Sequence, residues 1–524
     1  MDEHSELRGG VSGKIVRNTL YNFLGRFWIL IVGVFLTPYI IKCIGIERFG
    51  VWAIIGVITG YFSLFDFGVG SSFVKYLSEY YTRKEYDKIN QVINTGLVFY
   101  SFFGIGVIGV TFIFIDQLLV LFKVSAALYG ETKFVVSAGI VLFTCNNALS
   151  SFSSLQSGIQ RMDVTNKIAI GMSLINVTGI LMFLSLGYGL AGLMVNNIIL
   201  FCIATIVNIA VAFRLVPSLR LGVRFVNRRM LGMLFNFGFR VQMTKVAGVI
   251  TTQTDKILIG YFLSLGLVTY YQLGSGIVGA VMGFSYMLVS ALIPAFAEIE
   301  ARGERVKLIE AYLMTTKYLA FFMVPLFIFV IISAFHIMSV WMGQGYEKSA
   351  FIIQILALSS MINVIAQVAS STCLAIDKPQ LMARGSIIVV VLNVILSIVF
   401  IKMMGFYGVA WGTMVATNAG TVYFLVILHK VLGIPVKRFF QIIIPYLFVS
   451  VLAVAFVYAF DMLLRYIVPV PSRYLLFFIL LARGTIFTCV YIAGIRSGKL
   501  LGVNDILFLQ EKVPFARNII KSLA

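Results

Sequence analysis

The sequence predicts an all-α integral membrane protein, and three observations support this fold class. Hydrophobic residues make up 60% of the 524-residue chain and charged residues only 12%, whereas an ordinary soluble domain is about 25% charged. The apolar residues gather in stretches long enough to span a bilayer. Lys and Arg concentrate in the segments between those stretches. Such a chain needs lipid rather than water around most of its surface.

Each membrane-spanning helix needs about 20 mostly apolar residues. This criterion gives about 14 candidate spans along the chain. They are 18–42, 49–74, 91–115, 132–157, 168–187, 189–213, 231–262, 268–296, 308–335, 350–375, 385–404, 406–430, 441–460 and 473–495. We expect Pro38, Pro294, Pro325 and Pro445 to interrupt helices, either as functional bends or because proline is common in membrane helices.

The basic residues predict the orientation of these spans. The net charge of +20 does not form one patch but recurs in short loops, which argues against nucleic acid as a partner. With both termini in the cytoplasm, the inner segments hold about 27 Lys and Arg and the outer loops about 8. We therefore expect a multi-pass protein of the cytoplasmic (inner) membrane with both termini inside. The tail after Arg496 is either an amphipathic helix on the inner leaflet or disordered.

Two short signatures recur at an offset of 219 residues. Glu79, Arg83, Glu85 and Lys88 recur as Glu298, Arg302, Glu304 and Lys307, and Tyr188-Gly189-Leu190-Ala191 recurs as Tyr407-Gly408-Val409-Ala410. The repeat relates the first six spans to the next six in the same orientation, and substrate sites in such proteins lie between the halves near the midplane.

The spans and the repeat divide the chain into six parts. We predict an N-terminal cytoplasmic tail, an N-lobe, a basic cytoplasmic linker, a C-lobe, two further spans and a C-terminal cytoplasmic tail. Their bounds are 1–14, 15–213, 214–230, 231–430, 431–495 and 496–524.

Ionisable residues inside a membrane cost from about 3 to more than 10 kcal/mol, which makes them candidates for function. Arg26 and Lys245 are 219 residues apart, so the repeat places them at equivalent positions of the first and seventh spans. Two such cations would line a positive cavity between the halves. The alternatives are snorkelling to the interface or a structural ion pair.

The seventh span is the most polar of the candidate spans. Its six consecutive polar residues 251–256 cover every side of a helix, so some of them must face protein or water rather than lipid. Gln253 and Lys256 share one face at this spacing. We assign substrate binding to Arg26, Lys245, Arg240, Lys256 and Gln253. The alternative for Asp255 and Lys256 is a place near the outer interface.

Two acidic residues are candidates for ion coupling, namely Asp66 and Asp255. For Asp66, a structural pair or a helix cap is the alternative. Arg483 lies outside the repeat and receives no assignment. We expect no metal and no cofactor beyond a coupling H⁺ or Na⁺, since the three histidines are scattered and no phosphate-binding loop or hydrolase motif occurs.

Four segments resemble the polysaccharide, or O-antigen-type, flippase family of the multidrug/oligosaccharidyl-lipid/polysaccharide exporter superfamily. They are NTLYN at 18–22, FLTP at 35–38, GIERFGVW at 45–52 and LFDFGVG at 64–70. The resemblance implies a V-shaped pair of six-helix lobes, as in multidrug and toxin extrusion (MATE) transporters, around a cationic cavity. It also implies a transporter rather than an enzyme, with an undecaprenyl-diphosphate-linked oligosaccharide as cargo. A polysaccharide polymerase and other assembly proteins are the implied partners.

Three other functions can be compared with this one, of which the first remains open and the other two are disfavoured by the sequence. A lipid II-type flippase would share the fold and differ only in the sugar. An ion-coupled multidrug antiporter would need an acidic cavity, whereas the ionisable residues within the spans comprise six cations and two acids. The cations are Arg26, Arg240, Lys245, Lys256, Lys317 and Arg483, and the acids are Asp66 and Asp255. A polymerase or a glycosyltransferase would need a large outer loop or clustered cytoplasmic acids, and the sequence has neither.

Overall fold

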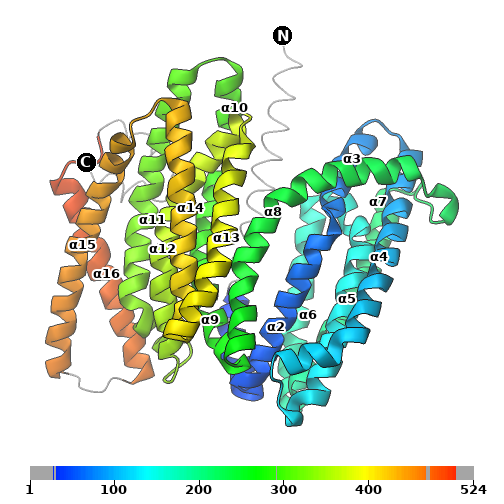
Figure 1. Ribbon diagram of the computed structural model, residues 1–524, viewed down its shortest axis with the longest axis horizontal. Helices are drawn as coiled ribbons and strands as arrows, with labels where there is room; N and C mark the ends of the chain where they lie inside the picture. The colour runs from blue at the N-terminus through cyan, green and yellow to red at the C-terminus, as the bar shows by residue number, and fades with distance from the viewer. Residues whose placement is uncertain (1–27, 29–30, 291, 468–471, 503–524) are drawn as a thin grey trace. The chain divides into compact units, whose positions relative to one another are not determined.

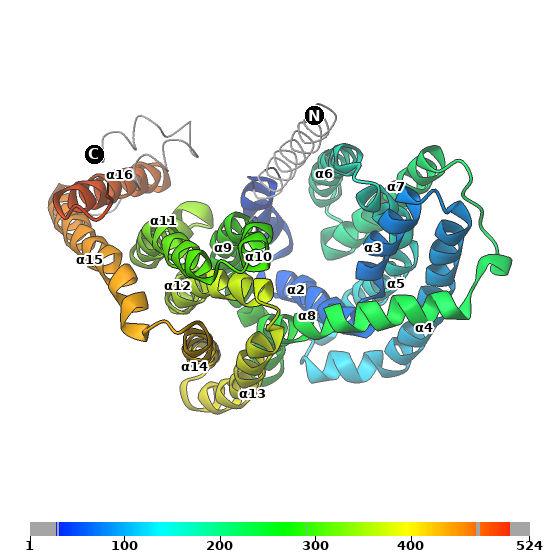
Figure 2. The same cartoon turned by 90° about the horizontal axis from the view of Figure 1, so that it is seen from above.

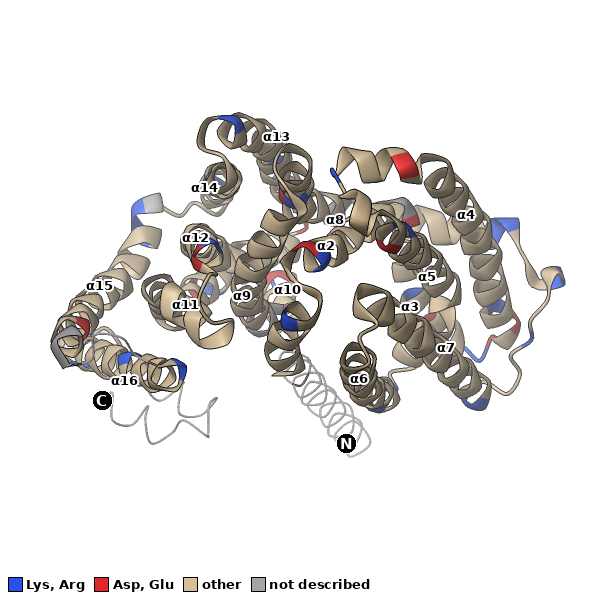
Figure 3. Cartoon of the chain, turned by 90° about the horizontal axis from the view of Figure 1, so that it is seen from below, with Lys and Arg blue, Asp and Glu red and all other residues tan. Residues whose placement is uncertain are grey.

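The computed structural model describes residues 28, 31–290, 292–467 and 472–502. Within these residues every regular element is a helix, as the sequence predicts (Figure 1). Eleven of the described helices are long and apolar enough to cross a membrane. Charged residues are sparse on them (Figure 3). The all-α membrane class is therefore confirmed, whereas the number of 14 spans stays a prediction.

The chain forms two compact units, Met1–Thr269 and Tyr270–Ala524. The predicted linker 214–230 and the helix after it, α8 (Arg228–Phe262), lie in the first unit, where α8 packs against other helices of that unit. The division into lobes by the internal repeat stays a prediction.

The first unit is a helical bundle. Its elements are the helix Ile31–Ile44, α2 (Ile46–Phe62), the 3₁₀ turn η1 (Ser63–Asp66), α3 (Val69–Thr82), α4 (Tyr86–Leu121), α5 (Ala126–Gly158), α6 (Met162–Ser185), α7 (Gly189–Leu215), η2 (Val223–Phe225) and α8. Helix α5 packs against α3, α4 and α7 (Figure 2). Phe73, Leu77, Tyr100, Phe152 and Leu155 belong to the buried core that joins α3, α4 and α5.

The second unit is built around α11. Its elements are α9 (Leu265–Ser290, from Tyr270 onward), α10 (Ile293–Ala301), α11 (Arg305–Trp341), α12 (Glu347–Ala375), α13 (Pro379–Met404), α14 (Phe406–Leu432), α15 (Val436–Ile467) and α16 (Arg473–Ser497). Helices α13 and α14 form a tightly packed antiparallel pair, while α11 packs against α12, α15 and α16. The two helices beyond the repeat therefore attach to the second unit through α11.

The predicted span 49–74 is not one continuous helix. Helix α2 ends at Phe62, η1 follows, and Phe67 and Gly68 adopt left-handed φ values of 53° and 73° before α3 begins. A Cβ atom on Gly68 would collide with the carbonyl oxygen of Gly238 in α8. Glycine is required here both for its backbone angle and for this close approach, and the apolar pattern alone did not reveal the break.

The predicted span 268–296 is also divided, because α9 ends at Ser290 and α10 begins at Ile293. Pro294 stands in the first turn of α10, where its missing N–H has no helical partner to lose. Pro325 and Pro445 lie inside α11 and α15 instead. Of these three prolines, only Pro294 marks a helix boundary.

The repeated signature adopts the same local structure in each unit. Lys84 and Gly303, 219 residues apart, have left-handed φ values of 59° and 71° in the turns before α4 and α11. The ion pairs are Arg83–Glu79 at 3.1 Å and Lys88–Glu85 at 2.9 Å in the first unit, and Arg302–Glu298 at 2.5 Å and Lys307–Glu304 at 3.1 Å in the second. Such exposed pairs contribute little stability, but their recurrence supports an internal repeat.

The basic linker 214–230 is held on α4 by two buried asparagines. Asn90 Oδ1 accepts from the backbone N–H of Arg220 at 2.9 Å, and Asn94 Oδ1 accepts from that of Gly222 at 2.9 Å. Asn94 Nδ2 donates to the Arg220 carbonyl at 2.8 Å. Asn227 then caps α8 by accepting from the backbone N–H of Arg229. The segment therefore places the start of α8 rather than acting as a free tether.

We expect Gly68→Ala to destabilise the first unit by about 2 kcal/mol or more. A left-handed backbone costs a non-glycine residue roughly 1–2 kcal/mol, and the collision with Gly238 adds to it. The matched control is Gly106→Ala in α4, where a Cβ meets open space and helix propensity predicts a gain of up to about 1 kcal/mol. Thermal unfolding of the purified protein in detergent measures both, and equal midpoints would contradict the prediction.

Candidate substrate site

The structure brings six of the seven predicted site residues onto two elements of the first unit. Arg240, Lys245, Gln253, Asp255 and Lys256 lie on α8, and Asp66 lies on η1. The seventh, Arg26, lies outside the described residues, and so do the side chains of Arg240 and Lys245.

The second half of α8 lies against α2 through its polar residues. The hydroxyls of Tyr61 and Thr254 form a hydrogen bond of 2.6 Å. Gly60 of α2 leaves room for the side chain of Gln253. A Cβ atom added to Gly60 would lie only 3.3 Å from that side chain. Gln253 Oε1 accepts from Lys256 Nζ at 3.2 Å, as their spacing on one helix face predicts.

Asp255 is almost fully buried, with 1% of its surface exposed. It therefore faces protein rather than lipid. Lys256 beside it is only half-buried. An amide and an ammonium group held together in this way can donate several hydrogen bonds to an anionic ligand.

The first half of α8 is tied to the α2–α3 break by hydrogen bonds to backbone carbonyls. Gln242 Nε2 donates to the carbonyls of Ser63 at 2.9 Å and Leu64 at 3.2 Å. Ser72 Oγ donates to the carbonyl of Leu234 at 2.6 Å. Sequence reasoning missed these residues, although Gln242 lies between Arg240 and Lys245, which it did assign to the site. Figure 1 shows the bend in α8 that lets it follow both α3 and α2.

Asp66 lies at the end of η1, in the break between α2 and α3. Its carboxylate accepts a hydrogen bond from the hydroxyl of Tyr100, a side chain on α4 that is 1% exposed. It also accepts from the backbone N–H of Gly70 in the first turn of α3, at 3.4 Å. These contacts favour the structural alternative for Asp66, and its part in ion coupling stays a prediction.

A cavity of about 870 Å³ lies within the first unit, among the helix Ile31–Ile44, α2, α5, α6 and α7. No Asp, Glu, Lys, Arg or His lines it among the described residues. Its polar groups are hydroxyls and amides, including those of Asn146, Asn176, Asn197 and Asn208. Sequence reasoning missed this cavity because it searched for charges. The available signal was the pairs of asparagines at 146–147 and 196–197 within apolar spans.

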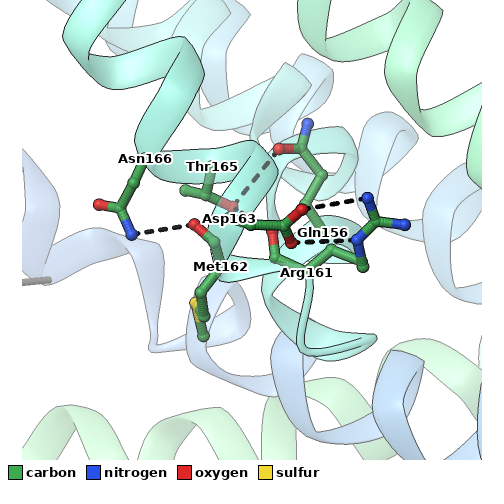
Figure 4. A network of polar contacts seen from close by, with 6 residues as sticks. All are labelled: Gln156, Arg161, Met162, Asp163, Thr165 and Asn166. Atoms are coloured by element: carbon green, nitrogen blue, oxygen red, sulfur yellow. Dashed lines mark hydrogen bonds and ion pairs between the residues drawn. The ribbon is translucent and has the colours of Figure 1, made fainter. Parts of the chain in front are cut away.

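A polar network fixes one end of the helices around this cavity (Figure 4). Buried Gln156 of α5 donates to Asn208 Oδ1 of α7 at 2.8 Å and accepts from Thr165 of α6 at 3.4 Å. In the turn between α5 and α6, Arg161 donates to Asp163 at 3.0 and 3.1 Å. These hydrogen bonds raise the pKa of Arg161 above its usual value. The network joins three cavity helices at one level.

The second unit contains a buried charged cluster that the sequence left unassigned. Arg483 of α16 is 3% exposed and lies 2.7 Å from His336 Nδ1 of α11 and 3.2 Å from the Asp461 carboxylate of α15. It also donates to the carbonyl of Ile332 at 2.8 Å. The cluster joins α15 and α16 to α11, which is a structural role.

The fold and these intramembrane polar sites define the class of this protein as a polytopic transporter-like membrane protein. The chain is similar to the lipid II flippase MurJ in an inward closed conformation, with a TM-score of 0.70 and 19% identity over 95% of this chain and 100% of that chain. It is also similar to an inward-facing multidrug resistance MATE family transporter of the MOP superfamily, with a TM-score of 0.61 and 14% identity over 79% and 94%. At these identities the likeness shows the fold alone.

The family described as "Polysaccharide biosynthesis protein" matches residues 15–300, more than half of the chain. The chain belongs to this family, as its resemblance predicted.

Two proteins have sequences that are similar to this chain. The probable low-salt glycan biosynthesis flippase Agl15 of Haloferax volcanii is 23% identical over 36% of this chain and 40% of its own length. The putative O-antigen transporter of Shigella flexneri is 21% identical over 70% of this chain and 87% of its own length. The chain thus spans less than half of the first relative and most of the second.

We expect Tyr100→Phe to destabilise the protein by about 1–3 kcal/mol, because the partly buried carboxylate of Asp66 then loses the hydroxyl that donates to it from α4. Tyr86→Phe, at an exposed position of the same helix, should stay within about 0.5 kcal/mol of the native protein. Asp66→Asn retains an acceptor oxygen and should cost less than Tyr100→Phe. Thermal unfolding in detergent tests all three, and an unchanged midpoint for Tyr100→Phe would rule out the structural role of this pair.

Proposed function

We propose that this protein is a flippase that moves an undecaprenyl-diphosphate-linked oligosaccharide across the cytoplasmic membrane by alternating access, for the assembly of surface polysaccharide. Its membership in the polysaccharide biosynthesis family is the observation that carries this proposal. The names of its relatives, a glycan biosynthesis flippase and an O-antigen transporter, support it. The basic residues between the spans support an orientation with both termini in the cytoplasm.

The polar residues of α8 suit an anionic cargo. A diphosphate carries about two negative charges, and cations bind it strongly where the dielectric constant is low. Arg26, Arg240, Lys245 and Lys256 are the proposed cations, with Gln253 as a neutral donor. The lipid tail stays in the bilayer, so the protein moves only the polar head group and no covalent bond changes. Transport of this kind needs no catalytic residue, and a polysaccharide polymerase and other assembly proteins would consume the flipped product.

A lipid II-type cargo is the alternative that the fold allows, because it presents the same diphosphate. An ion-coupled multidrug antiporter is less compatible with α8, whose residues 240–256 include three cations and one acid. Cationic drugs would be repelled by that balance of charge.

We expect Arg26→Ala and Lys245→Ala each to reduce surface polysaccharide in a strain that lacks the chromosomal gene, and the double variant to abolish it. The charge-conserving Arg26→Lys should retain activity, because a cation still faces the diphosphate. Arg496→Ala, in the last turn of α16, is the matched control and should leave polysaccharide unchanged. The amount of polysaccharide is compared at equal protein levels in the membrane. Full activity of the double variant would show that these cations do not bind cargo.

We further expect flipping to depend on a proton or sodium gradient, with Asp66 or Asp255 as the coupling residue, since the sequence contains no nucleotide-binding loop. Proteoliposomes that contain a fluorescent lipid-linked oligosaccharide measure flipping before and after ionophores collapse each gradient. Asp66→Asn and Asp255→Asn should be tested side by side, and the coupling variant should lose its response to the gradient. Flipping that persists at the native rate after both gradients collapse would exclude ion coupling.

A further inference from the structure

The cavity of the first unit differs in kind from α8, whose sequence carries proposed cations. Ten of its 30 lining residues carry a hydroxyl or an amide, and the rest are apolar or glycine. No residue that is charged at neutral pH lines it within the described part of the chain. Its volume of about 870 Å³ falls in the range of small-molecule sites. Such a lining serves a neutral, hydrogen-bonding occupant.

Two of the lining asparagines have side chains without a hydrogen-bond partner among the described residues. Asn146 on α5 and Asn197 on α7 line the cavity, and neither side-chain amide hydrogen-bonds to any described residue. An amide left without a partner at membrane depth is unfavourable unless water or a ligand supplies the hydrogen bond.

Asn196 and Asn208, two other asparagines of α7, behave differently. Asn196 Nδ2 donates to Asn176 Oδ1 at 2.8 Å, which joins α7 to α6. Asn208 accepts from Gln156 and donates to the carbonyl of Ala204, each at 2.8 Å. These amides hold helices together or satisfy the backbone. The contrast indicates that Asn146 and Asn197 serve the contents of the cavity rather than helix packing.

The chemistry of the lining selects one class of occupant. A diphosphate needs cations and an organic cation needs carboxylates, and the described lining provides neither. A sugar ring combines hydroxyls, which pair with amides, and C–H faces, which lie against apolar and aromatic walls. Trp52, Phe143 and Phe201 supply aromatic walls.

Helix α2 connects this cavity with α8. Trp52, Ile55, Gly56 and Thr59 line the cavity from one face of α2, and their spacing is that of a single helix face. The end of the same helix contacts α8, through the hydrogen bond between Tyr61 and Thr254. The cavity and the contact with α8 at Tyr61 therefore lie on different faces of one helix.

We propose that this cavity binds neutral sugar residues of the cargo, through Asn146 and Asn197, while the cations of α8 bind the diphosphate. The inference rests on the proposed function and extends it by naming the part of the chain that reads the glycan. It predicts that recognition of the sugar and recognition of the diphosphate can be removed separately.

The test compares two probes on the purified full chain in detergent. One is undecaprenyl diphosphate linked to the oligosaccharide of the source strain, and the other is undecaprenyl diphosphate without sugar. The double variant Asn146→Leu, Asn197→Leu should bind the glycosylated lipid about tenfold or more weakly, from the loss of two or more hydrogen bonds. It should bind the sugar-free lipid as the native protein does. Asn147→Leu, the neighbouring asparagine that does not line the cavity, is the matched control and should change neither affinity.

The outcomes separate the inference from the proposed function. Three results would overturn the sugar site and leave the diphosphate cargo in place. They are an equal loss of affinity for both lipids in the double variant, native affinity of the double variant for both lipids, and equal affinity of the native protein for both lipids. A native protein that binds neither lipid would overturn the proposed function and the sugar site with it. If the leucine variant does not elute as a single species, the smaller pair Asn146→Ser, Asn197→Ser is measured with the same expectations, because serine cannot reach as far as the amide.

Discussion

The close backbone contact between Gly68 and Gly238 is the constraint on which the rest of the first unit depends. In lipid, the hydrophobic effect does not drive one apolar helix against another, so association relies on close packing of small residues and on hydrogen bonds. Gly68 and Gly238 provide that packing, and Ser72 and Gln242 bond to backbone carbonyls on either side of it. The break between α2 and α3 exposes the carbonyls of η1 that Gln242 needs. The path of α8, which carries five of the predicted site residues, follows from this contact.

Asparagine and glutamine have three distinct uses in this chain. Asn90 and Asn94 satisfy the backbone of the segment before α8, and Gln156 and Asn196 join neighbouring helices. Asn146 and Asn197 instead face a cavity in the described part of the chain. A polar group is costly at membrane depth, so each use must repay that cost through a hydrogen bond. An amide that hydrogen-bonds to another part of the protein has a structural use, whereas an amide that faces the cavity is available to a ligand.

Charged residues show the same division. Arg483, His336 and Asp461 contact one another and join α15 and α16 to α11. The recurrent ion pairs beside α4 and α11 lie at exposed turns, where their contribution to stability is small. Lys256, half-buried beside Gln253, has a different environment from either group. The surroundings of a charged residue in the fold, rather than its charge, therefore distinguish a structural residue such as Arg483 from a candidate binding residue such as Lys256.

The sequence by itself determined the membrane class, most of the helices, the repeat signature and the family, because apolar length, charge spacing and short motifs are local properties of the chain. It also marked α8 as the polar helix and placed Gln253 and Lys256 on one face. It could not distinguish the structural use of Asp66 from ion coupling, since the answer depends on Tyr100 in another helix. The breaks at Gly68 and Ser290, the anchoring role of Arg483 and the neutral cavity were decided only by the tertiary structure. Each depends on which residues from distant parts of the chain meet, and neutral amides leave almost no trace in an apolar pattern.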